Sequence, residues 1–126
     1  MAHILVIDDD EQVRLILAQF LECDGHRVIT ARDGEEGLGL FRREAVDLVV
    51  TDIVMPRKEG IETIIELRTL RPDLKIIAMS GGGLAQGAPY LDFAQQFGAD
   101  AVLDKPVRMD DFRKAVSSCL AGQPVC

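Results

Sequence analysis

Two apolar patterns alternate along the chain. One is a short, mostly apolar run, which is typical of a strand buried in a parallel sheet. The other is an apolar residue at every third or fourth position, which is typical of an amphipathic helix. The runs predict five strands, at residues 3–7, 27–31, 46–51, 74–79 and 101–103. The spaced positions predict five helices, one after each strand.

The first and last predicted helices have the clearest apolar stripes. The stripe of the first consists of Val13, Ile16, Leu17, Phe20 and Leu21. We expect this helix to end at Asp24-Gly25, because glycine adopts the left-handed conformation that often ends helices. The stripe of the last consists of Met109, Phe112, Val116, Cys119 and Leu120.

Three further helices are predicted between the strands. They cover residues 35–44, residues 61–70 with the apolar stripe Ile61, Ile64 and Ile65, and a segment with Tyr90, Phe93, Ala94 and Phe97 at helical spacing. Gly37 and Gly39 lie within the first of these, and each glycine costs a helix about 1 kcal/mol relative to alanine. We therefore expect residues 35–44 to form the least stable helix.

The strict alternation of strands and helices predicts the fold class. Such a chain forms parallel strands joined by right-handed crossovers, with helices on both faces of one doubly wound α/β sheet. A length of 126 residues favours a single domain, and no repeat or internal linker interrupts it. We expect the domain to cover residues 1–121, with residues 122–126 as a C-terminal tail or a truncated linker.

Composition and charge argue against several classes of function. The net charge of −7 repels phosphate backbones, so direct nucleic-acid binding is not expected. No apolar run reaches the roughly 20 residues that cross a bilayer, and the N-terminus lacks the basic region of a signal peptide. A cytoplasmic domain without membrane contact is therefore expected. The three cysteines have no CxxC spacing and indicate neither a zinc site nor a disulfide framework.

Polar residues follow four of the five strands, at the sheet edge where open α/β sheets bind ligands. These residues are Asp8, Asp9, Asp52, Ser80 and Lys105. Adjacent strands lie about 4.8 Å apart, so three carboxylates would share one shallow cup if the first and third strands are neighbours. Their mutual repulsion and their hard oxygen atoms favour a bound Mg²⁺.

The same edge suits a phosphoryl group. Lys105 comes from two strands away, and its long side chain could span the roughly 10 Å to the carboxylates. Mg²⁺, a lysine and the Ser80 hydroxyl would together match the equatorial oxygens of a phosphoryl group. A carboxylate can attack phosphorus to form an acyl phosphate, which makes Asp52 the candidate nucleophile.

This set of motifs resembles the receiver domains of bacterial two-component response regulators. The motifs are Asp8-Asp9, Asp52-Ile53-Val54-Met55-Pro56, Ser80-Gly81 and Lys105-Pro106, each after its expected strand. The resemblance extends over essentially the whole chain. It implies a flavodoxin-like (βα)5 sheet with strand order 2-1-3-4-5.

The resemblance also implies a role for each motif residue. Asp52 would accept a phosphoryl group from a sensor histidine kinase or a phosphotransfer protein, in a reaction that needs Mg²⁺. Asp9, Asp52 and the backbone carbonyl of Val54 would bind the metal directly, and Asp8 would act through water. Ser80 and Lys105 would hold phosphoryl oxygens. The domain would thus be a signalling phosphoacceptor that catalyses only its own phosphorylation and dephosphorylation, and it would act on a downstream effector or output domain.

Two features depart from the usual receiver pattern. Receivers usually have Tyr or Phe three residues before the lysine, where it acts as a switch, but Val102 stands at that position here. The glycine-rich segment Gly81 to Pro89 is also somewhat longer than the usual connection. It indicates either a rebuilt fourth helix or a tolerated insertion.

Two other functions fit parts of the sequence. Asp8 and Asp10 after the first strand resemble the nucleophile motif of haloacid-dehalogenase phosphohydrolases, although Gln12 stands where that family has Thr or Val. The chain could also be a receiver-like module that binds partners without phosphorylation. The presence of Asp52, Ser80 and Lys105 argues against that module.

Overall fold

The computed structural model describes residues 2–53, 60–80, 98–104 and 106–121. The helix predicted around residues 90–97 lies outside these residues. So do Val54, the segment 81–89, Lys105 and the tail 122–126.

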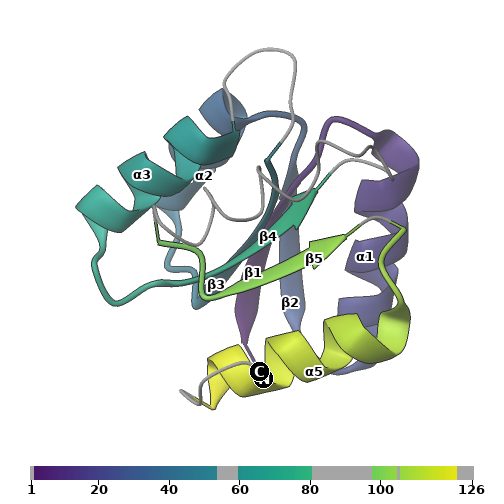
Figure 1. The fold of residues 1–126 in the computed structure, drawn as a ribbon. Coiled ribbons are helices and arrows are strands. Elements are labelled where there is room, and N and C mark those ends of the chain that lie inside the picture. The colour runs from purple at the N-terminus through teal and green to yellow at the C-terminus, as the bar shows by residue number, and fades with distance from the viewer. Residues whose placement is uncertain (1, 54–59, 81–97, 105, 122–126) are drawn as a thin grey trace.

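One five-stranded parallel sheet forms the centre of the molecule (Figure 1). Its strand order, β2-β1-β3-β4-β5, confirms the order that the resemblance implies. The strands are β1 His3–Ile7, β2 Arg27–Ala31, β3 Leu48–Asp52, β4 Lys75–Ser80 and β5 Ala101–Asp104. Every residue of β3 is buried, as expected for the central strand of a sheet covered on both faces.

The described helices are α1 Glu11–Cys23, α2 Gly34–Arg43, α3 Gly60–Leu70 and α5 Met109–Leu120. Two of them begin at a side-chain cap. The carboxylate of Asp10 accepts hydrogen bonds from backbone amides at the start of α1, and the carboxylate of Asp33 does the same at α2. The turn after α1 contains Gly25 at φ +92°, the conformation predicted for that end.

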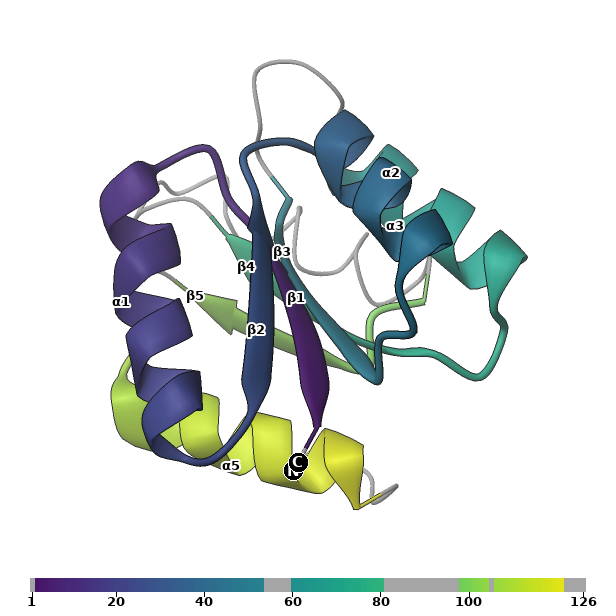
Figure 2. The same cartoon turned by 180° about the vertical axis from the view of Figure 1, so that it is seen from behind.

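The helices cover both faces of the sheet. Figures 1 and 2 show α1 and α5 on one side and α2 and α3 on the other. Two apolar cores result. Phe112 of α5 and Leu17 and Leu21 of α1 pack into the first core, and Leu38 of α2 and Ile64 of α3 pack into the second. This arrangement confirms the doubly wound α/β class.

Two members of the predicted apolar stripes are exposed. Ile16 of α1 is 55% exposed and Ile65 of α3 is 40% exposed. The spacing rule places both on the inner face, but α1 is turned so that Leu17 and Leu21 carry its contact with the sheet. The third strand is also shifted relative to its predicted range of residues 46–51: β3 begins at Leu48 and ends with Asp52 itself. None of the helices that the structure describes is long and apolar enough to span a bilayer.

Candidate functional site

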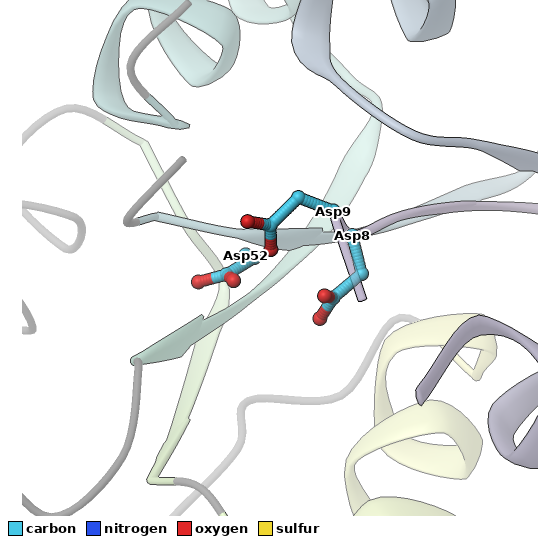
Figure 3. Close-up of side chains that lie close together, drawn as sticks. All are labelled: Asp8, Asp9 and Asp52. Carbon is cyan, nitrogen blue, oxygen red and sulfur yellow. The ribbon is translucent and has the colours of Figure 1, made fainter. Parts of the chain in front are cut away.

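Three carboxylates converge at one edge of the sheet. Ligand oxygens of Asp8, Asp9 and Asp52 all lie within 4.8 Å of one another, and Figure 3 shows these side chains gathered at the ends of two strands. Asp8 and Asp52 are buried, at 0% and 3% exposure, whereas Asp9 is exposed. Among the described residues, the cluster is therefore exposed at Asp9.

The sheet register explains why these residues meet. Ile7 of β1 is paired with Thr51 of β3. Asp8 and Asp52 are the next residues along these two segments, so they lie side by side at the same edge of the sheet. The pairing also continues beyond the strands. The amide of Asp8 donates to the carbonyl of Ala31, at 3.1 Å, and the amide of Ile53 donates to the carbonyl of Met79, at 2.9 Å. The backbone beneath the carboxylates is thus held by the neighbouring strands.

The turn after β1 is held by its own hydrogen bonds. One carboxylate oxygen of Asp8 accepts from the amide of Asp10 at 2.9 Å. The guanidinium of Arg14 donates to the carbonyl of Asp8 at 2.7 Å. Sequence reasoning did not single out Arg14. The sequence feature that could have indicated this contact is the position of Arg14 in the first turn of the helix after the acidic residues. An arginine at that position can reach back to the end of the strand.

Asp10 has a different task from its neighbours. Its carboxylate accepts hydrogen bonds from the amides of Gln12, at 2.9 Å, and Val13, at 3.5 Å, and so caps α1. It is not a member of the close carboxylate group. Helix capping therefore explains Asp10, the second member of the pair that suggested a phosphohydrolase.

The three carboxylates fit a divalent cation. Like charges this close repel one another, and a bound cation removes that repulsion. Few carboxylate ligands at an open edge leave coordination positions for water, which suits Mg²⁺ better than an all-protein Ca²⁺ cage. Within the described residues this is the one group of three acidic, histidine or cysteine side chains close enough to share an ion.

The other predicted site residues lie on the neighbouring strands or outside the described residues. Ser80 is the last residue of β4, and its backbone is paired with Asp104 at the end of β5. Lys105 follows Asp104 in the chain, but it lies outside the described residues, as does Val54. Val102, at the position where receivers usually have an aromatic ring, is partly buried against the core on the α2 and α3 side.

An apolar pocket of about 420 Å³ lies on the α1 and α5 side of this edge. Met79, whose backbone is paired with Asp52, lines it together with Ile16 of α1 and Val107 and Met109 near the start of α5. Its wall is almost entirely apolar carbon, which explains how Ile16 can be exposed and still have apolar neighbours. The acidic cluster thus has an apolar surface beside it.

Sequence comparison identifies the family. A family model described as the response regulator receiver domain matches residues 4–117. The chain belongs to the response regulator receiver family. The receiver resemblance seen in the motifs is therefore confirmed.

Curated relatives are longer proteins. The chain is 34% identical over 119 residues to the transcriptional regulatory protein GlrR of Escherichia coli, which covers 94% of this chain and 26% of GlrR. It is 37% identical over 110 residues to the response regulator MprA of Mycolicibacterium vanbaalenii, which covers 86% of this chain and 46% of MprA. The receiver chain thus spans between a quarter and a half of the length of these two relatives.

Solved structures share the whole fold. A response regulator receiver domain from Clostridium thermocellum superposes with a TM-score of 0.89 at 31% identity, covering 97% of this chain and 96% of that one. The response regulator TrrA of Thermotoga maritima, solved in complex with Mg(2+)-BeF, has a TM-score of 0.84 at 32% identity, covering 95% of this chain and all of TrrA. The chain is therefore a receiver domain, a signalling module of two-component systems.

Proposed function

We propose that this receiver is a phosphoacceptor, in which Asp52 takes a phosphoryl group from a histidine kinase or a phosphotransfer protein when Mg²⁺ is bound. The observation that carries the proposal is the convergence of Asp8, Asp9 and Asp52 within 4.8 Å at the end of the two central strands. The domain responsible covers residues 1–121, and residues 122–126 are a tail or part of a linker.

The reaction is a simple displacement at phosphorus. A carboxylate oxygen of Asp52 forms a bond to phosphorus as the bond between phosphorus and the donor nitrogen breaks, and the donor imidazole leaves with the electron pair. The product is an acyl phosphate on Asp52. The later reaction with water reverses the modification, so the domain catalyses only its own phosphorylation and dephosphorylation. Asp52 is 3% exposed, and this burial limits the orientations that its carboxylate can adopt.

Asp9, Asp52 and the carbonyl of Val54 would hold Mg²⁺ directly, and Asp8 would hold it through water. The metal supplies charge neutralisation for the phosphoryl oxygens. Asp8 is suited to the indirect role because one of its oxygens already accepts from the amide of Asp10. Asp9 is exposed and has a carboxylate available at the open side of the cluster.

Ser80 and Lys105 would complete the site by holding phosphoryl oxygens. They stand at the ends of β4 and β5, which are paired in register up to Ser80 and Asp104. A hydroxyl and an ammonium from adjacent strands would therefore approach the same group from one side. Their interaction with the phosphoryl group exists only in the modified protein, which is the requirement for a conformational signal.

The partners follow from this chemistry. The phosphodonor is a sensor histidine kinase or a phosphotransfer protein. The signal then passes to a downstream effector or an output domain. This domain itself would not contact nucleic acid, because its net charge is −7. It would act in the cytoplasm, where such phosphodonors work.

Intact-mass measurement tests the proposal. After incubation with acetyl phosphate and Mg²⁺, the wild-type chain should gain one phosphoryl group, and it should gain none when EDTA removes the metal. Asp52→Asn should abolish the gain while leaving the fold intact, because the amide has nearly the same shape and lacks the nucleophilic charge. Labelling of the Asp52→Asn variant at the wild-type level would refute the assignment. A folded chain that binds Mg²⁺ but is never labelled would favour the phosphorylation-independent module.

A further inference from the structure

Arg68, near the end of α3, joins three segments of the chain. One nitrogen of its guanidinium donates to the carbonyl of Pro72, at 2.8 Å, and to that of Leu74. The other donates to the carbonyl of Gly98 and to the carboxylate of Asp100, at 3.1 Å. The side chain is 25% exposed, so these bonds form in a largely desolvated place.

Asp100 is in turn bracketed by β4. Its backbone amide donates to the carbonyl of Ile76 at 2.7 Å, and its carboxylate accepts from the amide of Ile76 at 2.8 Å. The same carboxylate oxygen accepts from Arg68. The residue that immediately precedes β5 is therefore tied to one residue of β4 and to α3 at once.

Gly98 also fits this contact. Its φ of +121° is a backbone conformation that residues other than glycine rarely adopt. A Cβ at this position would lie 3.0 Å from Nε of Arg68. The side chain of Arg68 therefore packs against the backbone of the segment that leads into β5.

Strand β5 needs such a fixed starting point. It is an edge strand that pairs only with β4, and it has four residues. Ala101 is its one buried residue, while Val102 and Leu103 are half-buried. Register is set strongly where one face of a strand is buried, and weakly where it is not. The apolar pattern of β5 alone is therefore a weak determinant of its alignment.

We infer that Arg68, acting through Asp100, is a positioning residue for the phosphoryl site. The pair sets the register of β5 on β4 and so decides where Asp104, the residue before Lys105, stands against Ser80. Pairing runs from Ile77 with Ala101 to Ser80 with Asp104. A slip by one residue would move the end of β5, and with it the start of the segment that contains Lys105, by about 3.3 Å relative to Ser80. The role assigned to Lys105 rests on the proposed function, whereas the register of β5 does not.

The kinetic experiment combines Arg68→Ala with Lys105→Ala in a double-mutant cycle. The rate of labelling by acetyl phosphate should fall on the order of 10- to 100-fold in Arg68→Ala, because small misplacements cost that much. In the Lys105→Ala background, Arg68→Ala should have less than about a twofold further effect, because the residue it positions is absent. Mg²⁺ affinity should be unchanged in both, since the three carboxylates lie on other strands.

Arg71→Ala is the matched control. Arg71 directly follows α3, but its ion pair with Asp73 is long, at 3.6 Å, and Asp73 is highly exposed. The Arg71→Ala variant should be labelled by acetyl phosphate at the wild-type rate. If Arg68→Ala unfolds, Arg68→Lys replaces it, because lysine keeps the charge and loses the planar fork that reaches several acceptors together. Arg68→Lys should show a smaller rate loss in the same direction.

Backbone NMR tests the register without any phosphorylation. In wild type, cross-strand NOEs should join Ser80 to Asp104, and Arg68→Ala should weaken them and speed amide exchange in residues 101–104 but not in 48–52. Unchanged NOEs and exchange would overturn the inference, as would equal rate losses from Arg68→Ala with and without Lys105. Failure of the proposed function would look different, since wild type would not be labelled at Asp52 while the NMR result stood.

Discussion

Gly37 of α2 lies directly against Ile7 of β1. A Cβ on Gly37 would stand 2.4 Å from Cδ1 of Ile7 and 2.8 Å from its Cγ1, closer than carbon atoms approach without a shift. Ile7 is fully buried and immediately precedes Asp8. The glycine that weakens α2 as a helix therefore permits the close packing of that helix on the strand that leads into Asp8 and Asp9.

Gly37→Ala and Gly39→Ala should change stability in opposite directions. Each gains about 1 kcal/mol of helix propensity. At Gly37, overpacking against buried Ile7 costs about 1–3 kcal/mol, so Gly37→Ala should lower the free energy of unfolding. A Cβ on Gly39 meets nothing within 4 Å, so Gly39→Ala should raise it. Urea denaturation measures both, and equal stabilisation by both would show that Ile7 yields freely.

Asp9→Ala should weaken Mg²⁺ binding more than Asp8→Ala. The first substitution removes a proposed direct ligand, and the second removes a ligand proposed to act through water. Asp8 also holds the turn through the amide of Asp10, so its replacement should cost more stability. Titration with Mg²⁺ gives the affinities, and thermal unfolding without metal gives the stabilities. Equal loss of affinity in the two variants would overturn the ranking.

Lys105→Arg should impair the response although it keeps the charge. The ammonium is a compact donor, whereas the guanidinium is a planar fork that cannot occupy the same position beside a phosphoryl oxygen. Mg²⁺ affinity should stay at the wild-type level, because Lys105 is not a proposed ligand. Intact-mass time courses with acetyl phosphate measure labelling and its decay. A fully active Arg variant would indicate that only net charge matters there.

Cys119 should resist thiol reagents at neutral pH. Burial is the main cause that raises the pKa of its thiol to about 11, so roughly 0.1% is thiolate at pH 8. Cys23 is exposed and should react first. Maleimide labelling followed by mass spectrometry, in a Cys126→Ser background with Cys23→Ser as the control, separates the two sites. Fast modification of Cys119 in the folded chain would contradict its burial.

The same thiol makes stability depend on alkaline pH. Its folded pKa is raised above the unfolded value of about 8.5, so the folded state binds the proton more tightly. The contribution is complete below about pH 8.5 and is lost as the pH rises towards 11. The decline in urea midpoint over this range should be smaller in Cys119→Ala than in wild type, and an identical decline would assign it to other groups.

The sequence by itself determined the order and type of the described elements. Continuous apolar runs and three- to four-residue spacing are local patterns, and they predicted β1, β2 and α5 closely. Strand-end positions placed Asp8, Asp9 and Asp52 at one edge, because parallel strands end together. The strand order came from the family resemblance, since hydrophobic periodicity does not say which strands are neighbours.

Only the tertiary structure decided the contacts between segments far apart in the chain. Periodicity placed Ile16 inside, but the rotation of α1 on the sheet exposes it. Helix propensity predicted that Gly37 lowers the stability of its helix. The close contact with Ile7, which requires a glycine there, is visible only in the tertiary structure. No local pattern predicts the contacts of Arg68 with Gly98 and Asp100, because these two partners lie about thirty residues away. Such contacts depend on how packed layers meet, which a pattern along one segment does not encode.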